Sequence, residues 1–297
     1  MPGHHTQSLG APRGSRIDMK QETHHIQTRN DEFQLLQALQ TNRKKRSKQG
    51  RFIVEGVRSI NQLRANGGAA WTVDAYVYSK ERELSAWARE VLDRSPARRH
   101  IALAGELMED LSEREETSEL IAVLDMPERS LSAIPVIEPA TIVVIDRPTN
   151  PGNLGTTIRS CDAFGVHGVA VSGHTADLFD PRTIRAAAGS LFSVPVAQIT
   201  SSSQFADWVG ALRIQLSKLT VVGSSAGATH SCADQVFSDS TLLVIGSERT
   251  GLSHTFAELC DEIVTIPMLG SASSLNVSCA ASVLLYEIAR QRAAARQ

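Results

Sequence analysis

Small and polar residues gather at three points in the C-terminal half of the chain, each directly after an apolar run. The three segments are IDRPTNPGNLGTTIRS, VIGSERTGLS and TIPMLGSASSLNVS. In an open α/β sheet, ligands bind in the crevice beyond the carboxyl ends of the strands. The three segments therefore predict one shared ligand-binding crevice.

The first of these segments combines a tight turn with a cation. Pro151, Gly152 and Gly155 predict the turn. Asn153 is a natural helix cap, and Arg159 follows six residues later on the helix expected to start there. The five N–H donors of an arginine suit a phosphate or a developing oxyanion, whereas a salt-bridged surface arginine is the structural alternative.

The other two segments supply a carboxylate and a hydroxyl-rich loop. Gly246 and Gly251 flank Glu248, so the backbone can approach a ligand closely beside a carboxylate. The loop GSASS at residues 270–274 runs into an apolar helix expected from Leu275. The free N–H groups at the start of that helix suit a phosphate or the polar end of a nucleoside.

Other catalytic motifs are poorly supported. No segment matches the G-x-x-x-x-G-K-[ST] phosphate loop or the G-x-G-x-x-G dinucleotide fingerprint. Residues 223–227, GSSAG, fit the G-x-S-x-G nucleophile elbow, and Asp239 and His254 follow in the order of a hydrolase triad. That elbow needs a helix packed behind the serine, but the following residues ATHSCADQVFSDS are polar without an apolar face, so we reject a hydrolase.

Alternating strands and helices are expected to position the three segments. Residues 30–126 predict a smaller α/β domain, and the proline-containing residues 127–140 predict a linker. In the C-terminal domain, residues 141–297, near-continuous apolar strands predict a parallel sheet covered on both faces. The strands are expected at residues 141–146, 168–173, 219–224, 241–246 and 262–267. Residues 1–28, rich in Gly, Ser, Gln and His, predict a disordered tail.

Composition is that of an ordinary globular chain. With 297 residues, 42% of them hydrophobic, the chain is long enough for two folded domains. It has neither an apolar run of about 18 residues nor an apolar stretch near its N-terminus, so we expect no membrane span and a cytoplasmic location. The cysteines form no C-x-x-C pair, so we expect buried free thiols, with neither a structural metal nor a disulfide framework.

Positive charge is concentrated in one short part of the N-terminal domain, although the whole chain carries a net charge of −2. No acidic residue lies between Phe33 and Val54. The cluster in this stretch consists of Arg43, Lys44, Lys45, Arg46, Lys48 and Arg51. Such a cluster can neutralise several phosphates, whereas a solvated helix end or loop is the alternative.

Taken together, NPGNLGTTIRS, IGSERTGLS and IPMLGSASSLNVSCAASVLLYE resemble the motifs of the SpoU, or TrmH, branch of the SPOUT RNA methyltransferases. The resemblance covers residues 141–292, and NRKKRSKQGRFIVEGVRSI resembles the L30e-like RNA-binding domain that precedes the catalytic domain in this family. It implies an α/β fold whose C-terminal parallel-sheet domain contains a trefoil knot. It also implies S-adenosylmethionine as cofactor and a homodimer in which the neighbour completes each site.

The resemblance also assigns residues. The implied cofactor contacts are Gly246, Ile266 and Leu275, and the implied catalytic and structural polar set is Asn153, Arg159, Glu248, Ser274 and Asn276. The reaction is an in-line displacement in which a ribose oxygen attacks a sulfonium methyl group, so the protein must supply alignment. Because a guanidinium hardly ever loses its proton, Arg159 is expected to bind a phosphate and stabilise charge on the 2′-oxygen. The other four polar residues are expected to hold the loops in place.

Similarity through WAREVL, DRPTNPGNLG and GSASSLN points to the avilamycin-resistance type of this branch, which methylates a uridine ribose in 23S ribosomal RNA. We therefore expect a ribosomal RNA substrate, a role in antibiotic resistance, and contacts from the basic cluster to RNA phosphates. A transfer RNA substrate and a non-catalytic RNA-binding assembly factor are the alternatives.

Overall fold

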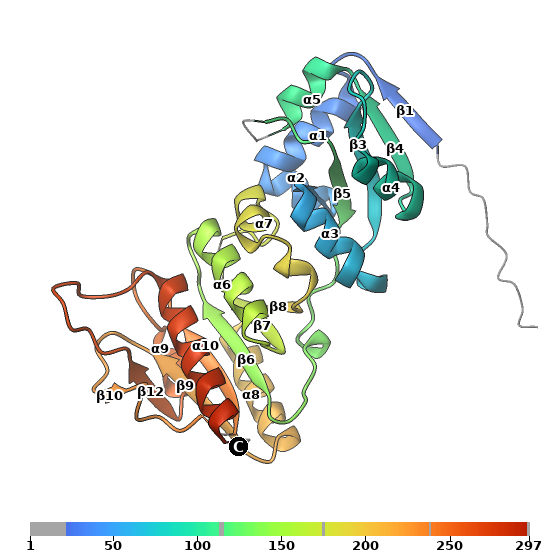
Figure 1. Ribbon diagram of the computed structural model, residues 1–297. Coiled ribbons are helices and arrows are strands. Elements are labelled where there is room, and N and C mark those ends of the chain that lie inside the picture. Colours follow the sequence, from blue (N-terminus) through green and yellow to red (C-terminus); the bar gives the residue numbers. More distant parts are fainter. Residues whose placement is uncertain (1–21, 113–115, 174–175, 238, 296–297) are drawn as a thin grey trace, which may run out of the picture.

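The computed structural model describes residues 22–112, 116–173, 176–237 and 239–295, which form two α/β domains (Figure 1). The N-terminal domain contains a five-stranded mixed sheet in the order β1-β4-β3-β5-β2. Its strands are β1 (Glu22–Ile26), β2 (Arg51–Glu55), β3 (Val73–Ser79), β4 (Arg99–Leu103) and β5 (Ile121–Asp125). Its helices are α1 (Asp31–Thr41), α2 (Arg43–Gln49), α3 (Val57–Asn66), the 3-10 turn η1 (Gly68–Ala70), α4 (Ala86–Arg94) and α5 (Gly105–Leu111).

The expectation of a disordered tail over residues 1–28 is wrong for its last part. Residues 22–26 form β1, which pairs in parallel with β4 at the edge of the sheet. Ile26 is its buried anchor, with 1% of its surface exposed. Because an edge strand is held largely by backbone hydrogen bonds, a stretch with one buried apolar residue shows little periodicity. Residues 1–21 lie outside the described part of the chain.

The C-terminal domain contains a seven-stranded sheet in the order β10-β12-β9-β11-β6-β7-β8, and every pairing in it is parallel. Its strands are β6 (Thr141–Asp146), β7 (Gly168–Ser172), β8 (Val196–Ile199), β9 (Leu219–Ser224), β10 (His230–Ser231), β11 (Ser240–Ile245) and β12 (Glu262–Thr265). The parallel sheet and its five expected strands are confirmed. The two edge strands, β8 and β10, were missed because four and two residues are too short to show a pattern.

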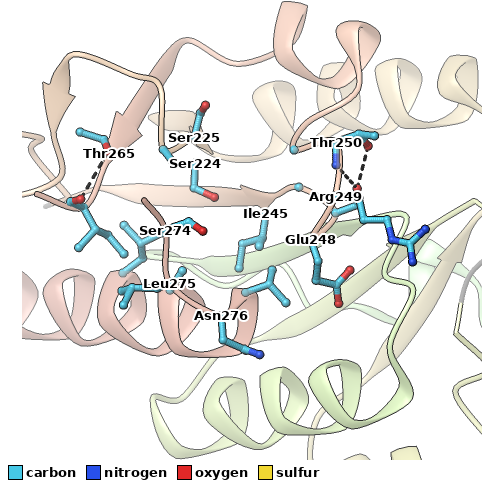
Figure 2. Close-up of a pocket in the computed structure, with 18 of the residues that line it drawn as sticks. Ser224, Ser225, Ile245, Glu248, Arg249, Thr250, Thr265, Ser274, Leu275 and Asn276 are labelled. Atoms are coloured by element: carbon cyan, nitrogen blue, oxygen red, sulfur yellow. Dashed lines mark hydrogen bonds between the residues drawn. The ribbon is translucent and has the colours of Figure 1, made fainter. Parts of the chain in front are cut away.

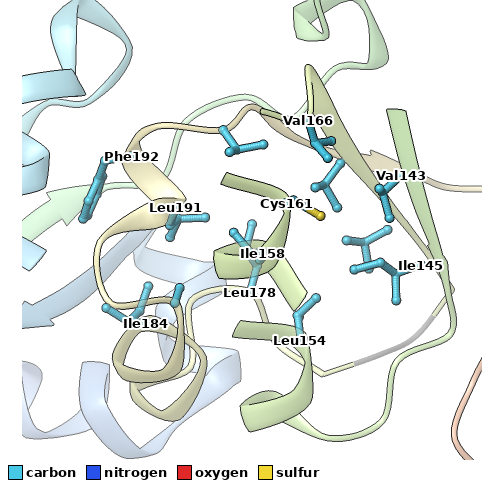
Figure 3. Packing of buried hydrophobic residues seen from close by; sticks show 14 of the residues in the cluster. Val143, Ile145, Leu154, Ile158, Cys161, Val166, Leu178, Ile184, Leu191 and Phe192 are labelled. Carbon is cyan, nitrogen blue, oxygen red and sulfur yellow. The ribbon is translucent and has the colours of Figure 1, made fainter. Parts of the chain in front are cut away.

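Helices cover both faces of this sheet. They are α6 (Pro151–Ala163), α7 (Pro181–Ala187), the 3-10 turn η3 (Ser190–Phe192), α8 (Ser202–Gln215), α9 (His254–Glu258) and α10 (Val277–Ala294), and the linker contains the 3-10 turn η2 (Leu131–Ala133). Successive residues of a strand point to opposite faces, so Val143 of β6 packs with α6 and α10, whereas Val144 packs with α8 and α9. Figure 1 shows α6 and α10 side by side on one face, and Figure 3 shows Leu154, Ile158 and Cys161 of α6 in that core. None of the described helices is long and apolar enough to cross a membrane.

Helix α6 begins earlier than the sequence indicated, and Gly155 has a different role. Asn150, rather than Asn153, caps the helix, because its side chain accepts a hydrogen bond from the backbone N–H of Asn153. Gly155 lies inside the helix against α7, where a Cβ atom would lie 2.3 Å from the carbonyl oxygen of Thr183. The glycine therefore permits two helices to pack closely rather than forming a turn.

The two domains share one hydrophobic core. The ring of Phe52 in β2 lies 4.5 Å from that of Phe179, and the ring of Trp71 lies 5.0 Å from that of Phe192. Beside these rings, Arg46 of α2 donates from Nη2 to Asp177 at 2.8 Å. Buried aromatic packing of this kind fixes the N-terminal domain against the start of the C-terminal domain.

We expect Phe52→Ala to destabilise both domains together by about 3–5 kcal/mol, because it removes a fully buried ring from the shared core. Urea unfolding followed by tryptophan fluorescence measures the loss. Ile214→Ala, at a position 88% exposed on α8, is the control and should change the free energy of unfolding by less than about 0.5 kcal/mol. A loss below about 1 kcal/mol at Phe52 would contradict the shared core.

Candidate active site

The three segments meet, as predicted, at a cleft of about 780 Å³ beyond the carboxyl ends of β9, β11 and β12. The start of α6 closes one side of the cleft, and the loop before α10 closes another. Figure 2 shows Glu248 and Asn276 at one side of the cleft, with Ser224, Ser225 and Thr265 at the other. Of the eight residues that the sequence assigned to the site, all but Arg159 line this cleft: Asn153, Gly246, Glu248, Ile266, Ser274, Leu275 and Asn276.

A short polar network joins the three segments. Asn153 donates from Nδ2 to Oε1 of Glu248 at 3.0 Å, and Asn276 donates from Nδ2 to Oδ1 of Asn153 at 3.1 Å. The other carboxylate oxygen of Glu248 accepts from the backbone N–H and the hydroxyl of Thr149. Asn276 also caps α10, since its Oδ1 accepts from the backbone N–H of Ser278 at 2.9 Å. Each amide thus fixes two loops at once, and Ser274 lies next to the network on the loop before α10.

This network sets the charge of Glu248. Partial burial alone would raise the pKa of the carboxyl group, but the hydrogen bonds from Asn153, from its own backbone and from Thr149 outweigh burial. The pKa of Glu248 is therefore below its usual value, and the side chain is a carboxylate at neutral pH. With its lone pairs engaged by three donors, this carboxylate positions the loop rather than transferring a proton.

We expect Glu248→Gln to slow the methyl transfer that the family resemblance implies by about 10-fold or more, because a carboxamide cannot accept from all of these donors and the loop shifts. Since the folded-state pKa is lowered, the carboxylate contributes stability that is present above the unfolded pKa of about 4.3 and is lost as pH falls through the folded pKa. The gap in unfolding free energy between wild type and Glu248→Gln should therefore close below about pH 4. Single-turnover rates and unfolding curves at several pH values measure both effects, and Glu258→Gln on α9 is the matched control. A gap that stays constant down to about pH 3 would contradict the role of the carboxylate.

Gly246 allows two backbone segments to meet at the cleft. A Cβ atom on Gly246 would lie 2.2 Å from the carbonyl carbon of Gly251 and 2.3 Å from the backbone nitrogen of Leu252. The loop closes on itself, because Ser247 and Gly251 exchange two backbone hydrogen bonds of 3.0 Å. The backbone of this loop is thus available to a ligand without an intervening side chain.

Asp146 and Arg147 also shape the cleft, although the sequence analysis did not select them. Asp146 at the end of β6 is 1% exposed and accepts from the backbone N–H of Ser253 at 2.8 Å. Arg147 holds both oxygens of Asp146 and reaches the carbonyl of Gly251 at 3.2 Å. Burial would raise the pKa of Asp146, but these hydrogen bonds lower it, so the pair stays charged and anchors the loop after β11. Asp146 could have been identified from the sequence, because it is an acidic residue at the end of an otherwise apolar strand.

Arg159 lies outside the cleft. It is exposed on α6, and among the residues that the structure describes it forms no hydrogen bond or ion pair. Helix α6 is joined to α10 beside it through the hydroxyls of Ser160 and Ser282, 2.8 Å apart. The guanidinium is therefore not among the groups of this chain that surround the cleft.

The residues of the basic cluster differ in how exposed they are. It forms α2 and the start of β2, and Arg43, Lys44, Lys45 and Lys48 are exposed. Arg46 was wrongly expected to face RNA, since it is 2% exposed and binds Asp177 together with backbone carbonyls of α1. Arg51 is directed into ion pairs with Asp74 and Asp125. The sequence cannot distinguish a buried arginine from an exposed one, because the two differ in their partners and not in residue type.

The structure removes the hydrolase alternative. The residues after Ser225 form a turn and the short β10 instead of the helix that a nucleophile elbow needs. His254 pairs with Glu258 on its own helix at 3.4 Å, and Asp239 lies 3.8 Å from Lys218. The aspartate and the histidine that the triad would need are therefore paired with other side chains.

Two further predictions concern metals and cysteines. Within the described ranges, no group of three or more His, Cys, Asp or Glu side chains could hold a metal ion. Cys161 and Cys232 are buried free thiols, as expected, whereas Cys260 is partly buried. Cys279 was wrongly expected to be buried, because it lies on the exposed face of α10.

Comparison with known proteins gives two family matches. Residues 140–286 match the model of the SpoU rRNA methylase family, and residues 30–122 match the model of the SpoU L30e-like domain. The chain is 44% identical over 283 residues to a 23S rRNA uridine 2′-O-methyltransferase of Streptomyces viridochromogenes, covering 95% of this chain and 97% of that protein.

Solved structures agree with these matches. The SpoU methyltransferase AviRb from Streptomyces viridochromogenes, in complex with the cofactor AdoMet, superposes with a TM-score of 0.84 at 45% identity, covering 89% of this chain and 99% of that one. An AdoMet-bound rRNA methyltransferase from Sinorhizobium meliloti superposes with a TM-score of 0.78 at 26% identity, covering 90% and 98%. The fold of both domains is thus shared with two methyltransferase structures that contain AdoMet.

Proposed function

Because the chain belongs to the SpoU rRNA methylase family, we propose that it transfers a methyl group from S-adenosylmethionine to the 2′-hydroxyl of a uridine in 23S ribosomal RNA. The observation that carries the proposal is 44% identity to a 23S rRNA uridine 2′-O-methyltransferase over 95% of the chain. Both the RNA-binding and the catalytic domain fall within that similarity. The proposed consequence is resistance to an antibiotic that targets the ribosome, in the cytoplasm where ribosomal RNA lies.

The cleft suits the cofactor in size and in chemistry. Its volume of about 780 Å³ lies within the usual range for small-molecule sites. Ile266 and Leu275 supply apolar walls, and the side-chain-free backbone at Gly246 offers main-chain groups to the polar parts of a nucleoside. S-adenosylmethionine supplies an activated methyl group on a positively charged sulfur. What the protein must add is a fixed geometry, which the network of Glu248, Asn153 and Asn276 provides.

We assign the charge stabilisation to Arg159 of a second protomer. Helices α6 and α10 expose adjacent stripes at helical spacing: Thr156, Arg159 and Ala163 on α6, with Cys279, Val283 and Tyr286 on α10. Val283 is 39% and Tyr286 58% exposed, so the strip carries apolar surface next to an arginine without a partner among the described residues. A homodimer that covers this strip would bury the apolar side chains and bring the guanidinium to the neighbour's cleft. There it would bind the phosphate beside the target ribose and stabilise the developing 2′-oxyanion.

The trefoil knot is part of the same proposal. Loops 246–252 and 266–276 both border the cleft, although β12 and α9 separate them in the chain. A knot would hold these two loops around one cofactor without a covalent link.

The proposal is tested by methyl transfer from labelled S-adenosylmethionine to unmodified 23S ribosomal RNA and, in parallel, to unmodified transfer RNA. Mass spectrometry then identifies the modified nucleoside. We expect 2′-O-methyluridine in the ribosomal RNA. Label confined to transfer RNA would mean that transfer RNA, and not ribosomal RNA, is the substrate. Absence of cofactor binding would leave a non-catalytic RNA-binding factor as the better explanation.

A further inference from the structure

A second groove, of about 690 Å³, opens where α2 of the N-terminal domain faces the start of α6. It shares Thr149, Asn150 and Arg249 with the cofactor cleft, so the two hollows adjoin. Arg43 of α2 lines its other side. The groove therefore connects the exposed end of the basic cluster with the mouth of the cleft.

The charges around this groove are unequal. Four arginines line it, Arg43, Arg46, Arg182 and Arg249, against the two aspartates Asp177 and Asp180. Both aspartates already have cationic partners. Nη2 of Arg46 lies 2.8 Å from Asp177, and Arg182 holds both oxygens of Asp180 at 2.9 and 3.1 Å. Burial would raise the pKa of Asp180, but its hydrogen bonds and the guanidinium of Arg182 lower it, so it remains charged and occupied. The two aspartates thus engage Arg46 and Arg182, and Arg249 adds to the groove a positive charge that neither aspartate pairs with.

Arg249 stands out among these four arginines. It is exposed, it follows Glu248 in the anchored loop after β11, and within the described residues it has no hydrogen-bond or ion-pair partner. Asp146 and Arg147 hold the same loop in place through Ser253 and Gly251. A guanidinium on a fixed loop loses less freedom on binding than one on a flexible loop.

Helix α2, which forms the side of the groove across from Arg249, is also held in place. Arg46 is buried between Asp177 and the carbonyls of Leu39 and Gln40, so it attaches α2 to the catalytic domain. Arg43 lies one turn before Arg46 on that helix. The spacing between Arg43 and Arg249 is therefore set by the shared core and not by a hinge.

We propose that this groove continues the cleft as one RNA channel, in which Arg249 and Arg43 bind backbone phosphates of nucleotides next to the target ribose. The inference rests on the proposed function and adds Arg249 to its RNA-binding residues, next to Arg43 of the basic cluster. Phosphates are the fitting group because guanidinium forks match them bidentately. No aromatic side chain on which a base could stack is among the described residues of the groove.

The experiment compares Arg249→Ala, Arg43→Ala and Arg249→Lys in the full-length protein. We expect each alanine variant to raise KM for 23S ribosomal RNA about 10-fold, with kcat changed less than about 3-fold. Each should also reduce the slope of log affinity against log salt by about 0.7 for every phosphate that the variant no longer neutralises. Arg249→Lys should bind RNA more tightly than Arg249→Ala but less tightly than wild type. Lysine keeps the positive charge but cannot form the two parallel hydrogen bonds of a guanidinium. Arg213→Ala, an exposed arginine of α8 paired with Asp261, is the matched control and should change neither quantity.

Two outcomes would overturn the channel. Unchanged KM and salt slope in both alanine variants would show that RNA takes another path, and a fall in kcat at constant KM would place Arg249 in the chemical step instead. Filter binding of 23S ribosomal RNA without methyl donor separates this test from the proposed function. A wild-type protein that binds this RNA with an Arg249-dependent salt slope, yet transfers no methyl group, would refute the proposed activity and support the channel.

Discussion

Replacement of Arg159 with Ala or Lys should cut methyl transfer by about 10²–10³-fold while leaving the fold and cofactor affinity unchanged. The guanidinium lies on the exposed face of α6, outside the cleft of its own protomer, so its removal disturbs no contact among the described residues. Lysine keeps the charge but lacks the several N–H donors with which a guanidinium can bind a phosphate and the 2′-oxygen at the same time. Single-turnover rates and calorimetric binding of S-adenosylhomocysteine measure the two properties. Near-full activity of Arg159→Lys would refute the assignment.

Mixed dimers decide whether Arg159 acts across the interface. The mixture is assayed at a concentration of S-adenosylmethionine well below the dissociation constant of the Gly246→Ala variant, where a homodimer of either variant is expected to be almost inactive. If the arginine serves the neighbour's cleft, a dimer of the two contains one site with both changes and one intact site, so random mixing restores about a quarter of the sites. If the arginine serves its own cleft, every site in the mixture carries one defect, and activity stays at the background. The second result would contradict the proposed dimer arrangement.

Gly246→Ala should weaken cofactor binding about 10- to 100-fold or more, which is the second large effect. The added Cβ would lie 2.2 Å from the carbonyl carbon of Gly251 and 2.3 Å from the backbone nitrogen of Leu252, so the loop must move. Overpacking against backbone costs about 1–3 kcal/mol, and each 1.4 kcal/mol corresponds to a factor of about ten in affinity. Calorimetry with S-adenosylmethionine measures the change.

Gly227→Ala supplies the control for this prediction. Gly227 lines the same cleft, but a Cβ there would meet only the hydroxyl of Ser225 at 3.9 Å, an ordinary van der Waals distance. We expect its affinity for the cofactor to stay within about threefold of wild type. Equal losses in the two variants would mean that any added carbon in the cleft blocks binding, and the close approach at Gly246 would then have no special role.

The exposed strip on α6 and α10 connects these predictions. Tyr286 packs edge to face with Phe164 at 6.4 Å but remains 58% exposed, and Val283 lies one turn before it. Apolar side chains in line with an arginine are typical of the centre of a protein interface. The same surface therefore supports both the dimer and the assignment of Arg159 to the neighbour's site.

The sequence by itself determined the parallel sheet, the crevice segments and their family. Strands buried on both faces consist of continuous apolar runs, and the residues after them must meet at one edge of a parallel sheet. The resemblance to the family motifs, which depends on local order along the chain, assigned eight residues, and seven of them line the cleft.

Only the tertiary structure decided which polar groups meet. Asn153 lies 95 residues from Glu248 and 123 from Asn276, so no local pattern predicts the network between them. The burial of Arg46 depends on Asp177, 131 residues away, and β1 depends on a backbone edge offered by β4. Each of these features is a pairing between distant parts of the chain. Residue type records what a side chain can bind, whereas its partner is fixed only when folding brings two segments together.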